Sequence, residues 1–148
     1  MITADQTETV AFLASPVTHG GAAVERIETH ASIVFVTGTR AWKLKRAVRY
    51  DYLDFSTAER RKLMCEAEVR VNRRTAPTVY RGVVAVTREP DGSLALGGSG
   101  AAVDWLVEMV RVDGLVRLLL EREVVEGDEV RRRLASEPAP PALRVASA

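Results

Sequence analysis

The pattern of polar and apolar positions predicts one short helix followed by a series of strands. Residues 7–15 carry apolar side chains at helical spacing and precede Pro16, so we expect a short helix and then a loop over residues 18–21. The period then changes to that of strands, in the segments 24–28, 32–37 and 40–50. The second segment is apolar through its centre, which is typical of a strand buried on both faces. Gly38-Thr39 precedes the third segment and predicts a tight hairpin.

The longest helix is predicted to begin at residue 56. Ser56-Thr57-Ala58-Glu59 has the form of a capping box, in which a hydroxyl and a carboxylate satisfy two free backbone amides. One apolar stripe follows, and we expect it to pack on a sheet. Its residues are Leu63, Met64, Ala67 and Val71. Pro77 prevents the helix from continuing.

Three further strands are predicted after this helix, at residues 80–88, 93–96 and 103–111. Pro90-Asp91-Gly92 lies between the first two of these strands and is typical of a turn. Gly97-Gly98-Ser99-Gly100 predicts a flexible hairpin turn, in preference to a phosphate-binding loop. The whole order predicts an α+β fold, with a mostly antiparallel sheet and one long helix packed on a face.

The last third of the chain has a different character. Leu115 to Glu123 has a helical period, and the residues that follow are charged. Residues 136–148 are rich in Pro, Ala and Ser and have little to bury, so we expect a disordered tail there. The predicted organisation is a folded lobe at 1–111, a helical extension at 112–135 and the tail.

Length and charge narrow the class of protein. The 148 residues, 47% of them apolar, suffice for one domain with a core. The chain has 21 basic and 20 acidic residues, so its net charge of +1 gives no overall argument for nucleic acid or membrane binding. No apolar run approaches the ~20 residues of a membrane span, and the first residues lack an export signal. We therefore expect a cytoplasmic location and no membrane partner.

The content of cysteine and histidine limits the available chemistry further. Cys65 is the only cysteine, which excludes an internal disulfide. Because it lies in the middle of a predicted helix, we expect a buried structural thiol and not a nucleophile. His19 and His30 are the only histidines, which counts against a zinc site.

The strand-like stretch 40–45 carries the strongest candidates for binding chemistry. Alternation places Ala41, Lys43 and Lys45 on one face of this strand. A lysine on a rigid strand beside a small residue is how kinase-type sites neutralise nucleotide phosphates. An exposed basic strand face is the simpler interpretation. Glu68 borders the apolar stripe of the long helix, from which its carboxylate can reach a strand lysine.

Four segments together resemble one bacterial family. These segments are residues 24–36, 41–48, 52–57 and 65–77. The family is that of the aminoglycoside-phosphotransferase-like proteins, which often carry a P-loop ATP-binding domain as well. The resemblance covers roughly Val10 to Arg111. It implies the small N-terminal lobe of a protein-kinase-like fold, which binds ATP with Mg²⁺.

The resemblance also implies roles for particular residues. Lys43 would contact the α- and β-phosphates, with Lys45 as the alternative, and Glu68 would be the ion-pair partner of the lysine. The loop 28–32 would cover the phosphates through His30, Ser32 and its backbone N–H groups. The adenine would bind the backbone of a hinge, at Val107, Glu108 and Met109.

The resemblance ends before the large C-terminal lobe, in which such enzymes hold their catalytic Asp and their metal-binding Asn and Asp. Nothing after Arg111 resembles that lobe. Phosphoryl transfer depends on in-line positioning and on charge stabilisation by metal ions. We therefore expect an incomplete nucleotide-binding lobe that does not catalyse by itself.

Two other functions stay open. Between Arg40 and Arg81, twelve basic and five acidic residues give +7, which would suit RNA or another polyanion. The low aromatic content of 5% counts against that interpretation, because few rings are available to stack on bases. Alternatively, a lobe without its partner lobe exposes apolar surface, which favours self-association or docking onto a separately encoded partner.

Overall fold

The computed structural model describes residues 1–112, and its first elements lie where the apolar pattern predicts them. Helix α1 spans Thr7–Ala14, and a 3-10 turn, η1 (Pro16–His19), takes up part of the predicted loop. Strands β1 (Val24–Glu28) and β2 (Ser32–Thr37) follow. All six residues of β2 are buried, which confirms a strand covered on both faces.

The third predicted strand is shorter than expected and is followed by a separate small hairpin. Strand β3 spans Arg40–Lys45, and it pairs with β2 around a tight hairpin, as predicted. Strands β4 (Arg49–Tyr50) and β5 (Leu53–Asp54) pair only with each other. The Arg46 N–H still donates to the Ala31 carbonyl at 2.8 Å, one position beyond the last pair of β2 and β3, and the chain leaves the main sheet after this bond.

Helix α2 spans Ala58–Asn72, and its start differs from the predicted capping box. Thr57 is the N-cap, and its hydroxyl accepts a hydrogen bond from the Arg60 N–H at 3.2 Å. The Ser56 hydroxyl donates instead to Asp54, at 2.6 Å. The prediction of Ser56 as the cap was therefore wrong by one residue, because a carboxylate at the end of β5 captures the serine.

The apolar stripe of α2 faces outward, contrary to prediction. Leu63, Met64 and Val71 are 63%, 42% and 55% exposed. The buried face carries Arg61, Cys65 and Val69. The prediction failed because the sheet offers α2 charged partners as well as apolar ones, so charged helix positions are buried in ion pairs while apolar ones stay outside.

Strands β6 (Tyr80–Arg88), β7 (Leu94–Leu96) and β8 (Ala101–Val110) complete a sheet of order β1-β2-β3-β8-β6-β7, in which every pair of neighbours is antiparallel. Strand β6 separates β7 from β8, so Gly97–Gly100 is a crossover connection and not the predicted hairpin turn. A Cβ at Gly100 would lie 1.9 Å from the Arg88 carbonyl oxygen, so this close approach of two backbones requires glycine.

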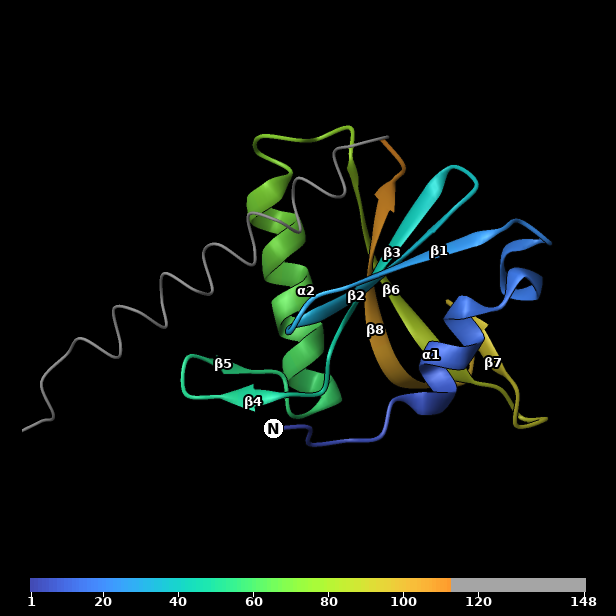
Figure 1. The fold of residues 1–148 in the computed structure, drawn as a ribbon, viewed down its shortest axis with the longest axis horizontal. Coiled ribbons are helices and arrows are strands. Elements are labelled where there is room, and N and C mark those ends of the chain that lie inside the picture. The colour runs from blue at the N-terminus through green and yellow to red at the C-terminus, as the bar shows by residue number, and fades with distance from the viewer. Residues whose placement is uncertain (113–148) are drawn as a thin grey trace, which may run out of the picture.

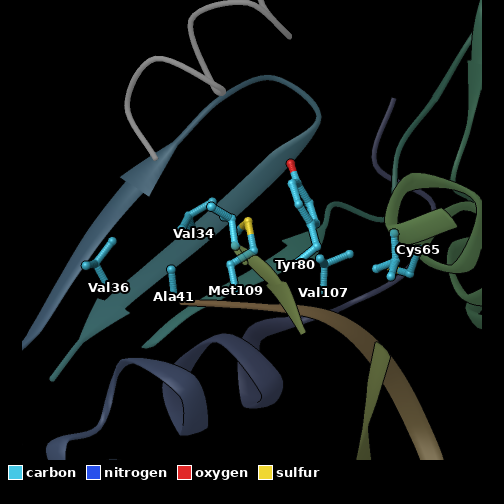
Figure 2. Packing of buried hydrophobic residues seen from close by; sticks show 9 residues of the cluster. Val34, Val36, Ala41, Cys65, Tyr80, Val107 and Met109 are labelled. Carbon is cyan, nitrogen blue, oxygen red and sulfur yellow. The ribbon is translucent and has the colours of Figure 1, made fainter. Parts of the chain in front are cut away.

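The sheet curls between the two helices, α2 on one side and α1 on the other (Figure 1). The core cluster on the α2 side joins residues of four strands to Cys65 of the helix, as Figure 2 shows. A second cluster on the α1 side includes Leu13, Phe35 and Leu106. The α+β class and the mostly antiparallel sheet with a long helix on one face are thus confirmed.

The predicted helical extension at 112–135, with its segment Leu115 to Glu123, and the tail at 136–148 lie outside the described residues, apart from residue 112. Within residues 1–112, neither helix has the length and apolar character needed to cross a membrane.

Candidate functional site

The two strand lysines lie in the middle of the sheet and point toward α2. Strand β3 has neighbours on both sides, β2 and β8. In the register, Lys43 is opposite Val34 on β2 and Val107 on β8, and Lys45 is opposite Ser32. Residues directly opposite in a sheet share a face, so these side chains form one row beneath the helix. The predicted alternation of β3 is therefore confirmed.

Glu68 of α2 binds both lysines. Its Oε1 accepts from the Lys43 Nζ at 3.0 Å, and its Oε2 accepts from the Lys45 Nζ at 2.6 Å. The ion pair of Lys43 with Glu68 expected from the sequence is present. Lys45, expected only as an alternative to Lys43, takes part at the same time. We refer to Lys43, Lys45 and Glu68 as the lysine clamp.

The lysine clamp is largely removed from water. The side chains of Lys43, Lys45 and Glu68 are 9%, 4% and 13% exposed. Burial by itself raises the pKa of Glu68, but the ammonium groups of Lys43 and Lys45 outweigh burial and hold the pKa at about 2. Glu68 is therefore ionised throughout the neutral range and anchors two positive charges.

A buried hydroxyl lies beside the lysine clamp. Ser32 is fully buried and is opposite Lys45 in the register of β2 and β3. Its Oγ has no hydrogen-bond partner among the described residues. A buried hydroxyl without a partner is costly, and such groups are often completed by a ligand or an ordered water. Ser32 thus carries a buried hydroxyl without a partner among the described residues, at the strand position opposite Lys45.

The turn between β1 and β2 uses several of its backbone donors internally. The Thr29 Oγ1 accepts hydrogen bonds from the N–H groups of Ala31 and Ser32, at 3.3 and 3.0 Å, so these donors are already used. The His30 ring lies against Tyr50 of β4, with ring centroids 6.2 Å apart. In this arrangement His30 packs on the β4–β5 hairpin, whereas Ser32 belongs to the row of the lysines.

The three residues expected to form a hinge lie within a strand. Val107, Glu108 and Met109 lie inside β8. This strand pairs with β3 along one edge and with β6 along the other. The Glu108 side chain binds Arg40 and Arg81 on the opposite face of the sheet. The side chains of Val107 and Met109 belong to the α2-side core, as Figure 2 shows. Strand β8 itself ends at Val110.

A second buried ionic group, which the sequence analysis missed, fixes α2 on the sheet. The Arg61 Nε donates to Asp104 Oδ1 at 2.8 Å, and its Nη2 donates to Asp104 Oδ2 at 3.1 Å. The Gln6 amide donates to the same carboxylate at 2.8 Å and to the Lys45 carbonyl at 3.0 Å. No motif or spacing links these positions. The one signal available in the sequence was Asp104 itself, a charged residue among the apolar residues of β8.

Cys65 lies in the core, as predicted. It is fully buried, and its Sγ is 3.9 Å from the Trp105 carbonyl oxygen. Burial raises the pKa of this thiol to about 12. At neutral pH the sulfur is therefore a protonated core group and not a nucleophile. Among residues 1–112, no group of three or more His, Cys, Asp or Glu side chains is arranged to hold a metal ion.

Curated mycobacterial proteins share part of this sequence. One protein of Mycobacterium tuberculosis strain H37Rv and one of Mycobacterium bovis, both described as uncharacterized, are 40% identical to the chain over 68 residues. The matched stretch is 46% of this chain, and it spans 14% of the length of each relative. No protein-family model and no solved structure matches the chain.

Proposed function

We propose that this chain is a nucleotide-binding lobe of the aminoglycoside-phosphotransferase-like, protein-kinase-like type, and that it binds ATP through the lysine clamp. One observation carries the proposal: a helix carboxylate binds a lysine in the centre of a sheet, at 3.0 Å, in a buried site. In kinases this pairing presents the lysine to the α- and β-phosphates. The sheet-and-helix arrangement and the sequence resemblance both agree with it.

In the proposed complex, each polar group of the site has a definite part. The Lys43 ammonium neutralises phosphate oxygens, and the Ser32 hydroxyl, which lacks a partner among the described residues, donates to one of them. The adenine lies beside the end of β8, at Val110.

The proposed activity is binding without catalysis. Phosphoryl transfer needs carboxylates that hold Mg²⁺ and a group that orients the acceptor. The described residues contain no acidic cluster for the metal. Mg²⁺ would accordingly arrive bound to the phosphates of ATP. This lobe would neutralise the phosphates and hold them in position.

Calorimetry with Mg²⁺ and ATP tests this proposal through Lys43→Ala. We expect the variant to bind ATP about 10- to 100-fold more weakly than the parent, because a charge-assisted hydrogen bond contributes about 1.5–3 kcal/mol. Lys62→Ala is the matched control, since Lys62 lies on α2, bound to Glu66 at 3.9 Å and outside the clamp. Equal affinity of parent and Lys43→Ala, or no binding by the parent, would rule out the phosphate role.

The basic residues behind the polyanion alternative are partly paired with carboxylates. Of the twelve basic residues between Arg40 and Arg81, nine form ion pairs with carboxylates. These nine share six carboxylates, so their charge is compensated in part. Salt distinguishes the two functions, because polyanion binding collapses between ~50 and ~200 mM salt, whereas binding of an adenine nucleotide keeps an apolar, salt-tolerant part.

A second candidate function, docking onto a partner or onto another copy, is favoured by the outer face of α2. Leu63, Met64 and Val71 expose apolar surface on one side of this helix. A row of large exposed apolar side chains is typical of an interaction surface.

Size-exclusion chromatography of the double variant Leu63→Glu/Met64→Glu tests the docking role. If the stripe joins copies of the chain, the parent elutes as an oligomer and the variant as a monomer, because two charges in an apolar interface are strongly unfavourable. Glu66→Gln on the same helix serves as the control. A parent that elutes as a monomer at all concentrations would exclude self-association through this face.

A further inference from the structure

One part of the buried sheet face extends past helix α2. Val36 of β2 and Ala41 of β3 are opposite each other in the register, and they are 6% and 0% exposed. Helix α2 packs chiefly on β8 and β6, and Figure 2 shows Val36 and Ala41 at the end of the cluster away from Cys65 of this helix. Helix α1 lies on the other side of the sheet. The helices of residues 1–112 therefore leave the burial of this pair unexplained, because an apolar sheet face is buried where another element packs on it.

The chain leaves the described region beside this pair. Strand β8 ends at Val110, and the Arg111 N–H donates at 2.9 Å to the Thr39 carbonyl, in the hairpin that joins β2 and β3. Thr39 is two residues from Ala41 along the chain. The residues after 112 thus start at the hairpin end of this surface, and three residues span up to about 10 Å. A segment that begins at residue 115 can therefore reach Val36 and Ala41.

The sequence that follows is suited to cover an apolar surface. Asp113-Gly114 is typical of a turn, which would redirect the chain after β8. Five of the six residues 115–120 are apolar, and Leu115, Leu118 and Leu119 have the i, i+3, i+4 spacing of one helix face. Contact of such a face with water is unfavourable, so it favours packing on another apolar surface.

We infer that the segment 115–123 packs on the α2-side face of β2 and β3, over Val36 and Ala41. The outer stripe of α2 is the alternative surface for this segment. Leu63 of that stripe is 63% exposed, however, whereas Val36 and Ala41 are buried. The difference in exposure assigns the segment to the sheet.

Resting on the proposed function, this cover also competes with ATP. Ala41 is on the same face of β3 as Lys43, and Met109 of β8 is opposite Ala41 in the register. Both Ala41 and Met109 lie near the place proposed for the adenine, at Val110. ATP binding then requires the segment to leave this face. The measured ATP affinity is reduced in proportion to the fraction of molecules in which the face is uncovered.

Methyl NMR of the full chain tests the contact without any substitution. We expect nuclear Overhauser effects from the methyl groups of Leu118 or Leu119 to those of Val36 or Ala41. Samples that mix differently labelled copies should show none of these effects between copies. Effects between copies alone would mean that a second copy covers the sheet, and effects to Leu63 would place the segment on α2. Either result, or the absence of all these effects, overturns the inference.

Calorimetry with Mg²⁺ and ATP tests the competition through the double variant Leu118→Glu/Leu119→Glu. We expect this variant to bind ATP about tenfold more tightly than the parent, because carboxylates do not pack on an apolar face and the uncovered fraction rises toward one. Arg117→Gln is the matched control, since Arg117 interrupts the apolar run of the segment, and it should bind ATP like the parent.

Unchanged ATP affinity in Leu118→Glu/Leu119→Glu, with a melting temperature close to that of the parent, overturns the competition. If this variant melts well below the parent, Leu118→Ala/Leu119→Ala takes its place, and tighter ATP binding is expected of it as well. A parent that binds no ATP overturns the proposed function, and the competition with it. The Overhauser effects still decide independently whether the segment covers the sheet.

Discussion

Asp104→Asn is expected to lower the free energy of unfolding by about 3–5 kcal/mol, the penalty typical of a buried ion pair that loses one partner. Asparagine keeps the size of the side chain but removes its charge. The Arg61 guanidinium, bound to Asp104 by two hydrogen bonds, would stay buried without a counter-ion. The Gln6 amide would also lose a charged acceptor.

Urea unfolding at neutral pH measures this effect. Asp51→Asn is a suitable control, because Asp51 is an exposed residue of the β4–β5 hairpin. The control should change the free energy of unfolding by less than about 0.5 kcal/mol. If Asp104→Asn lowers the free energy of unfolding by less than about 1 kcal/mol, the Arg61 guanidinium has found water or another acceptor. The ion pair then does not fix α2.

The second large effect is a loss of stability in acid that depends on Glu68. The pKa of Glu68 is about 2 in the folded protein, against an ordinary value of 4.5. The unfolded chain therefore takes up the proton first as the pH falls. The contribution of Glu68 is complete above about pH 4.5 and is lost as the pH falls toward 2; a difference of this size corresponds to about 3 kcal/mol.

Unfolding free energies of the parent and of Glu68→Gln, measured from neutral pH down to pH 2, reveal this contribution. The variant should be less stable at neutral pH, because two ammonium groups lose their carboxylate, and the difference should shrink in acid. Glu66→Gln, on the exposed face of the same helix, should follow the parent. Parallel curves for the parent and Glu68→Gln would show that the ion pairs do not stabilise the fold.

The strands could be predicted from the sequence because their patterns are local. The uninterrupted apolar run of β2 and the alternation of β3 each reflect the two faces of one strand, and the structure confirms both. Helix α2 shows the limit of this reasoning. Its position was predictable, whereas its orientation depends on Asp104 and the two lysines, which lie on strands distant in sequence.

The residues of the site also fall into those that could be predicted from the sequence and those that could not. Lys43 and Glu68 could be predicted as partners because the segments around them resemble a known family, whereas the alternation of β3 alone also fits an exposed basic face. Gln6 could not, since it reaches Asp104 across 98 residues of sequence. The predicted hinge lies inside β8, which continues to Val110, and nothing in the apolar run of this strand marks its end.

The location of β3 determines which part of the lysine clamp can move. Strands β2 and β8 hold β3 along both edges, so its backbone is confined and the lysines can change only their side-chain torsions. Glu68 sits on a helix, and a helix can rotate or slide without breaking a ladder of strand hydrogen bonds. The two ammonium groups of this site are therefore carried by a confined strand, whereas its carboxylate is carried by a helix whose place depends on the Arg61–Asp104 ion pair, so that pair also determines where Glu68 lies.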